Sequence, residues 1–139
     1  MTNQEIQEKL NAKRKGTYFK IAFRKVKGDY SRTTTTIVRL VKYANTKKAK
    51  ERALNNPNKV SKANPNDKYL GNNLIFNENT QKTRLQVFLT NCQYHKPHSV
   101  YEYNGKEISS EEYYEGTNTK PSAPSELMCI DTSEIVMIY

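Results

Sequence analysis

The segment from Tyr18 to Tyr43 constrains the fold more than any other part of the chain, because it has the pattern of two long β-strands joined by a turn. In YFKIAFRKVK, residues 18–27, apolar residues alternate with cations. Side chains two residues apart point to the same side of a strand, so Phe19, Ile21 and Phe23 are expected in a core. The KGDYSR segment then offers turn residues, and TTTTIVRLVKY is largely β-branched. We therefore expect a long antiparallel hairpin with one buried face.

Shorter apolar or alternating segments predict further strands. The Asn104-Gly105 dipeptide is typical of a two-residue hairpin turn, so the segments on either side of it are expected to pair. The predicted strands cover residues 74–76, 84–90, 100–103 and 106–108, and a last apolar strand lies within residues 127–139.

Two capping-box patterns, Ser or Thr followed three residues later by Glu, predict short helices. The first predicts a helix over residues 3–13 within an N-terminal helical arm, residues 1–16. The second predicts a helix of about six residues that ends near Gly116. One or two further helical turns are expected between Asn45 and Leu54, followed by a loop rich in Asn, Pro and Lys over residues 55–73.

The length of 139 residues suits one domain and is short for two. We treat the Asn-rich loop as an excursion within a single domain, residues 1–139, because a hairpin and a short helix alone would bury little apolar surface. The predicted fold is β-rich α+β, a five- or six-stranded bent antiparallel sheet or small barrel, OB-like or SH3-like, with short helices.

The positive charge is concentrated in one half of the chain. The net charge is +9, and residues 1–70 hold 18 Lys and Arg against 5 Asp and Glu, whereas residues 71–139 hold 5 against 9. A basic half attracts polyanions such as nucleic acid. An Asn-, Lys- and Ile-rich composition also suits an AT-rich genome, which would raise the Lys content without any functional cause.

The chain has neither a signal-like start nor a run of 18 apolar residues, and it contains only two cysteines. These features predict a protein of the cytoplasm of a host cell or of a virion, without a membrane partner.

The sequence carries no motif of a hydrolase, a nucleotide-binding enzyme or a metalloprotease, so we expect no enzyme, no cofactor and no catalytic residue. One hypothesis for the cysteines and histidines is a small zinc-binding module. A Cys and two His stand three residues apart, and a distant Cys would complete four ligands, namely Cys92, His95, His98 and Cys129. The alternative, which we prefer, is that both Cys are small buried residues and both His lie in a loop, with no metal bound.

The basic hairpin is the main candidate site, because cations that contact phosphates and rings that stack on bases hold single-stranded nucleic acid on small barrels. The alternative is an ordinary solvated strand face whose lysines prevent aggregation. A second function is an interaction or virion-structural module, which would self-associate or pair with a phage or host protein through its edge and C-terminal strands. The predicted nucleic-acid residues are Tyr18, Lys20, Arg24, Lys25, Lys27, Tyr30, Arg32, Arg39, Lys42, Tyr43, Lys47 and Lys48.

Four phrases of the sequence together resemble small uncharacterised proteins of tailed phages of gut bacteria, including crAss-like phages. They are KGTYFKIAFRKVKG, TTTTIVRLVKYANTKKA, VYEYNGKEISSEEYY and the terminal DTSEIVMIY. The resemblance implies a phage or prophage product in the cytoplasm. It implies no activity and no functional residues.

Overall fold

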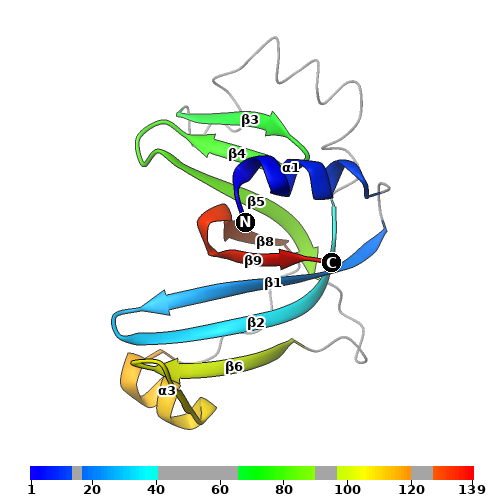
Figure 1. Ribbon diagram of the computed structural model, residues 1–139. Coiled ribbons are helices and arrows are strands. Elements are labelled where there is room, and N and C mark those ends of the chain that lie inside the picture. The colour runs from blue at the N-terminus through cyan, green and yellow to red at the C-terminus, as the bar shows by residue number, and fades with distance from the viewer. Residues whose placement is uncertain (14–16, 41–65, 90–96, 120–126) are drawn as a thin grey trace.

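The computed structural model describes residues 1–13, 17–40, 66–89, 97–119 and 127–139, and it leaves the side chains of Tyr69 and Leu127 undescribed. Within these ranges the chain forms a curled antiparallel sheet with two short α-helices and a 3-10 turn (Figure 1). The helices are α1 (Asn3–Asn11) and α3 (Ser110–Thr117), and the 3-10 turn is η3 (Thr132–Glu134). The strands are β1 (Tyr18–Lys27), β2 (Tyr30–Arg39), β3 (Asp67–Gly71), β4 (Leu74–Asn77), β5 (Lys82–Leu89), β6 (His98–Tyr103), β7 (Lys106–Ile108), β8 (Leu127–Asp131) and β9 (Ile135–Ile138).

Six strands follow one another in the order β3-β4-β5-β2-β1-β9 and curl into a half-barrel, while β8 pairs with β5, and β6 and β7 pair beside β2. This arrangement confirms the predicted β-rich α+β fold with a bent antiparallel sheet. The β1–β2 hairpin is in continuous register from Tyr18 opposite Arg39 to Lys27 opposite Tyr30. One edge of β2 is shared, since residues 30–35 pair with β6 and residues 38–39 pair with β5. The long hairpin therefore belongs to the half-barrel at one end and to the β6–β7–α3 unit at the other.

The core fills the hollow of the half-barrel. Phe19, Ile21 and Phe23 are buried in it, as the alternation in β1 predicted, together with residues of β2, β4, β5, β8 and β9. Helix α1 begins where the capping box predicted, because the Thr2 side chain accepts a hydrogen bond from the Glu5 N–H at 3.2 Å. The two apolar residues of α1, Ile6 and Leu10, are fully buried in this core. The first helix is thus a packed part of the fold and not a separate arm, and it lies across the curl between the β3–β4 hairpin and β9 (Figure 1).

Two segments differ from their predicted structure. Residues 67–71, predicted as the end of a loop, form strand β3, because the buried Asp67 is bonded by Asn77 and Arg84 of the neighbouring strands. The C-terminal segment, predicted as one strand, is divided in two by η3, since the Asp131 side chain accepts a hydrogen bond from the Ser133 N–H at 2.9 Å and caps the turn. The rest of the predicted loop and the predicted helix between Asn45 and Leu54 lie outside the described residues.

The β6–β7 hairpin confirms the Asn-Gly prediction, with φ of 50° at Asn104 and 77° at Gly105, the left-handed conformation that a type I′ turn requires. Helix α3 then begins after Ser109, whose side chain accepts from the Glu112 N–H at 3.2 Å. It ends one residue beyond Gly116, with Asn118 in the left-handed region as the cap. Neither of the described α-helices is long and apolar enough to cross a membrane.

Candidate nucleic-acid interface

The register of the β1–β2 hairpin divides the predicted nucleic-acid residues between two opposite faces. Residues directly opposite each other in the ladder share a face. Tyr18 pairs with Arg39, and Lys20 and Arg24 lie on that same side. On the other side, Lys25 pairs with Arg32 and Lys27 pairs with Tyr30, continuing the side that holds Phe23. The four remaining predicted residues, Lys42, Tyr43, Lys47 and Lys48, lie outside the described residues.

The side with Tyr18 is exposed and combines rings with cations. Tyr18 is 62% exposed, and Lys20 and Arg24 are also exposed. The guanidinium of Arg39 lies 4.8 Å from the ring centroid of Phe88, its partner in β5. Within the described residues, none of the three cations forms an ion pair. We call this surface the outer face, and it comprises Tyr18, Lys20, Arg24, Ile37, Arg39, Phe88, Met137 and Tyr139.

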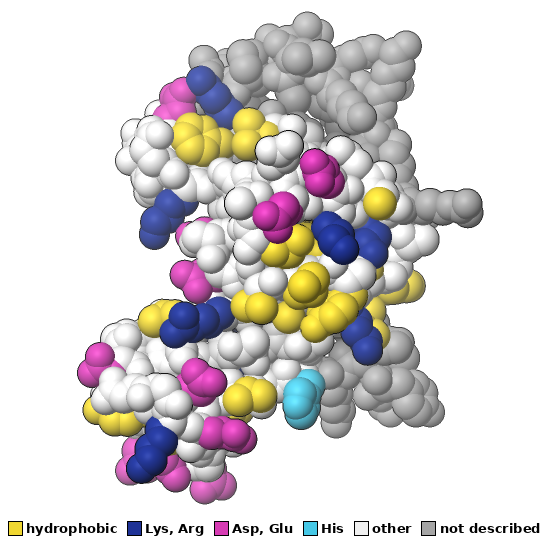
Figure 2. Space-filling view, in the orientation of Figure 1, with side chains coloured by type: hydrophobic (Ala, Val, Ile, Leu, Met, Phe, Trp, Pro, Cys, Tyr) yellow, Lys and Arg dark blue, Asp and Glu magenta, His cyan; other side chains and the backbone are white. Residues whose placement is uncertain are grey.

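Four members of the outer face were missed by sequence reasoning, namely Ile37, Phe88, Met137 and Tyr139. Met137 pairs with Ala22, and the Tyr139 N–H donates to the Lys20 carbonyl at 3.0 Å, which places these residues beside β1. Tyr139 is 58% exposed. Figure 2 shows hydrophobic side chains gathered over β9 and β1 with Lys or Arg side chains at their margins. One signal was present in the sequence, because Phe88 stands on the polar side of an otherwise regular alternation in β5.

The opposite side of the hairpin tip is packed against α3 by a group of five rings that we call the tyrosine cluster. Tyr30 stacks on Tyr103 with ring centroids 4.5 Å apart, and Tyr113 of α3 meets Tyr101 at 5.1 Å. Tyr114 meets the Tyr113 ring edge to face at 5.2 Å. Aromatic pairs at these distances stabilise beyond their buried area. Tyr30, predicted as a nucleic-acid residue, thus lies where it helps to attach α3 to the sheet.

The three cations on this side have partners or neighbours of their own. Arg32 donates to the hydroxyl of Tyr114 at 2.8 Å, and Lys27 donates to the hydroxyl of Thr119 at 2.7 Å. Burial and, second, the charge of Arg32 lower the pKa of the Lys25 ammonium. The hydrogen bond with Tyr101 and, second, burial raise the pKa of the Tyr114 hydroxyl. The predicted residues are therefore divided into two groups, the outer face with its rings and cations, and three cations beside the tyrosine cluster.

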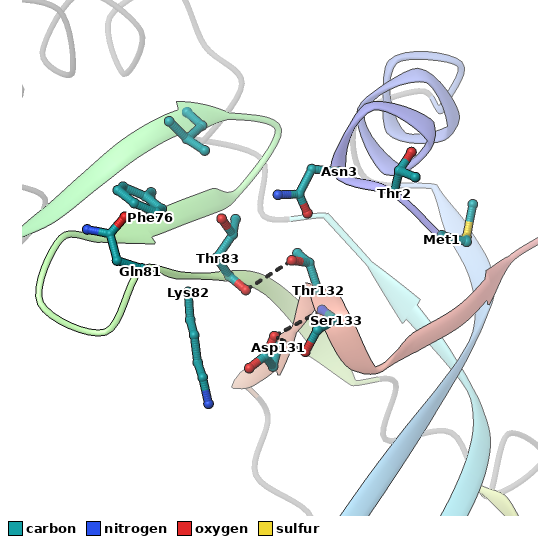
Figure 3. A pocket seen from close by; sticks show the side chains of 11 residues that line it. Met1, Thr2, Asn3, Phe76, Gln81, Lys82, Thr83, Asp131, Thr132 and Ser133 are labelled. Carbon is teal, nitrogen blue, oxygen red and sulfur yellow. Dashed lines mark hydrogen bonds between the residues drawn. The ribbon is translucent and has the colours of Figure 1, made fainter.

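An open cavity of about 610 Å³ lies between the start of α1, the β4–β5 turn and η3 (Figure 3). Two of the side chains that line it are ionisable, Lys82 and Asp131. The polar groups that face it are bonded to one another, since the Thr132 hydroxyl donates to the Thr83 carbonyl at 3.2 Å and the Ser133 hydroxyl donates to Asp131 at 2.7 Å. The Asp131 carboxylate oxygen that accepts from the Ser133 hydroxyl also accepts from the Ser133 N–H at 2.9 Å, so these groups cap η3.

The predicted zinc ligands are only half within the described residues. His98 lies in β6 and Cys129 lies in β8, and both side chains are exposed. Cys129 is therefore not the buried residue that the preferred alternative expected, because Gln86 of β5, its partner in the ladder, also belongs to the polar side of the sheet. Cys92 and His95 lie outside the described residues, so the zinc hypothesis stays a prediction.

Comparison of the chain with protein-family models, curated protein sequences and solved structures finds no match.

Proposed function

We propose that the protein is a non-enzymatic, phage-type accessory protein that binds single-stranded nucleic acid on the outer face without reading its sequence. The observation that supports this proposal best is that one face of the β1–β2 hairpin exposes rings and cations, and that these cations have no ion-pair partner within the described residues. Tyr18 and Tyr139 offer rings, and Lys20, Arg24 and Arg39 offer positive charge beside them. Proteins that hold single strands use this combination, with stacking on the bases and cations along the phosphates.

The composition of the outer face favours contact with the backbone over recognition of bases. Its polar groups are mainly the charged ends of Lys and Arg, which contact phosphates without reading the sequence. Stacking on a ring tolerates every base, because each base has a π face. A duplex keeps its bases stacked inside, so it would use the cations of this face but not its rings. A single strand is therefore expected to bind more tightly than a duplex of equal length.

The nucleic-acid proposal predicts a specific loss for the variant Lys20→Gln/Arg24→Gln. Its affinity for a labelled oligonucleotide is expected to fall about tenfold at low salt, because two phosphate contacts are lost. The slope of log affinity against log salt is expected to fall by about 0.7 for each lost contact with a single strand. Fluorescence anisotropy at several salt concentrations measures both quantities.

The matched control is Lys82→Gln/Lys106→Gln, which removes the same charge from exposed positions on β5 and β7. This control is expected to keep nearly the full affinity. Equal losses in the two double variants would show that net charge, and not the outer face, attracts the oligonucleotide. No binding by the unmodified protein at low salt would remove the proposal.

A second candidate is an interaction or virion-structural module that uses β9. This strand is the last one of the main path, and it exposes Val136 by 49% and Met137 by 40%. Edge strands with exposed apolar residues pair with other chains. A concentration-dependent multimer in light scattering, without affinity for oligonucleotides, would favour this candidate over the first.

A further inference from the structure

Two cations lie directly opposite each other on the side of the hairpin that faces α3. Lys25 of β1 and Arg32 of β2 are partners in the antiparallel ladder. Opposite residues in such a ladder have their Cβ atoms about 5 Å apart, and like charges at that separation destabilise the sheet. Lys27 follows on the same side, so the positive charge is continuous to the hairpin tip.

No acid neutralises this pair within the part of the chain that the structure describes. The ion pairs found there are Lys68 with Glu78 and Arg84 with Asp67, both in the β3–β4–β5 part of the sheet. Arg32 uses Nη1 to donate to the Tyr114 hydroxyl, while its Nε is buried without an acceptor. A guanidinium that lacks an anion and leaves one donor unsatisfied retains a strong attraction for negative charge.

The surroundings of the pair are polar and rigid. The Tyr114 hydroxyl lies 3.5 Å from that of Tyr101, and the Arg32 guanidinium lies over the Tyr113 ring at 6.0 Å. Thr34 and Ser99, the next pair on this side of the sheet, join their hydroxyls at 2.9 Å. The contacts with Tyr114 and Tyr113 restrict the Arg32 guanidinium, so a ligand that binds it costs little further side-chain entropy.

We propose that Lys25 and Arg32 form a site for a phosphate group, which bridges the ammonium of one and the guanidinium of the other. A phosphate monoester carries a charge near −1.5 to −2 at neutral pH, enough to neutralise both cations. The planar guanidinium binds two phosphate oxygens at once, while the ammonium contributes a point charge. The proposed phosphate site lies on the side of the hairpin that faces α3. It does not depend on binding of nucleic acid by the outer face.

The test follows thermal unfolding while inorganic phosphate is added up to about 20 mM in place of chloride, at constant ionic strength. Phosphate that binds only the folded protein raises the Tm with a saturable dose dependence, by about 5–10 °C at a hundredfold excess over its Kd. The variant Lys25→Gln is expected to lose this rise. Arg32 is left unchanged, because it also packs against α3.

The variant Lys82→Gln is the matched control, because it removes the same charge from an exposed position of β5, outside the hairpin. It is expected to keep the full phosphate response. The proposal is overturned if phosphate causes no saturable rise in the Tm of the unmodified protein. It is also overturned if the Tm of Lys25→Gln rises equally, because phosphate then acts as a stabilising salt and not by binding at this site.

Two sources of the phosphate group are distinguished by oligonucleotide binding to Lys25→Gln. If this variant loses both the phosphate response and part of its oligonucleotide affinity, the site takes a phosphate of the strand's backbone. If it loses the phosphate response alone, the site takes a free phosphate or a phosphorylated small molecule. Both results keep the site, and the second does so even where the outer face binds no nucleic acid.

Discussion

Replacement of Asp67 by alanine is expected to lower the free energy of unfolding by about 2–4 kcal/mol, because it leaves a partly buried cation without its counter-ion. The Asp67 side chain is 2% exposed and accepts hydrogen bonds from Arg84 and, at 2.8 Å, from Asn77. Without the carboxylate, the Arg84 guanidinium and the Asn77 amide lose their acceptor inside the β3–β4–β5 region. Urea unfolding at neutral pH measures the change.

The exposed ion pair of the same region supplies the matched control. Lys68 of β3 and Glu78, which follows β4, form a contact in which both side chains are more than 40% exposed. Exposed pairs contribute little, so Glu78→Ala is expected to cost about 0.5 kcal/mol or less. A cost for Asp67→Ala no larger than that of Glu78→Ala would contradict the structural role of the buried pair.

The pH dependence of stability is an independent test of the contact between Asp67 and Arg84. The hydrogen bond from Arg84 is the largest cause that lowers the pKa of Asp67 below its ordinary value in the unfolded chain. A carboxyl whose pKa is lower in the folded state stabilises the fold above its unfolded pKa, near about 4, and loses this contribution as the pH falls through the folded value. We expect stability to fall more steeply below about pH 4 in the unmodified protein than in Asp67→Ala.

Replacement of Gly116 by alanine is expected to weaken the attachment of α3 to the hairpin and to lower the free energy of unfolding by about 1–3 kcal/mol. A Cβ built on Gly116 would lie 2.2 Å from Cζ and 2.4 Å from the hydroxyl oxygen of Tyr30. The Tyr30 ring has little freedom to move, because it is stacked on Tyr103 and meets Tyr113 edge to face. Urea unfolding and the near-ultraviolet circular dichroism of the tyrosines measure the two effects.

A second substitution, at Tyr30, is expected to reverse the sign of the effect of Gly116→Ala on the free energy of unfolding. Where Tyr30 is replaced by leucine, the space beside Gly116 is freed, and Gly116→Ala should then stabilise by up to about 1 kcal/mol through its better helix propensity. The difference between the two backgrounds is the coupling energy of the contact. The same cost in both backgrounds would mean that Gly116 is needed for another reason than the close approach of Tyr30.

Local patterns predicted the elements that depend on near neighbours. Alternation over residues 18–27 placed Phe19, Ile21 and Phe23 in the core, and the Asn104-Gly105 turn and the two capping boxes appear as expected. Strand β3 was missed, because its place in the sheet comes from Asp67, a residue that local propensity assigns to loops. The residues it needs, Asn77 and Arg84, are ten and seventeen positions away.

The candidate site was predicted as one set of residues, and the fold separates that set. The sequence by itself determined that the chain forms a β-rich fold around a basic hairpin and that the odd-numbered apolar residues of β1 are buried, because strand periodicity is a local property. Only the tertiary structure decided which cations share a face with which rings. Pairing of β5 with β2 brings Phe88 beside Arg39, and pairing of β9 with β1 brings Tyr139 beside Lys20, while docking of α3 places the tyrosine cluster against Arg32. These pairings depend on strand order and on packing between distant segments, which no pattern within one segment encodes.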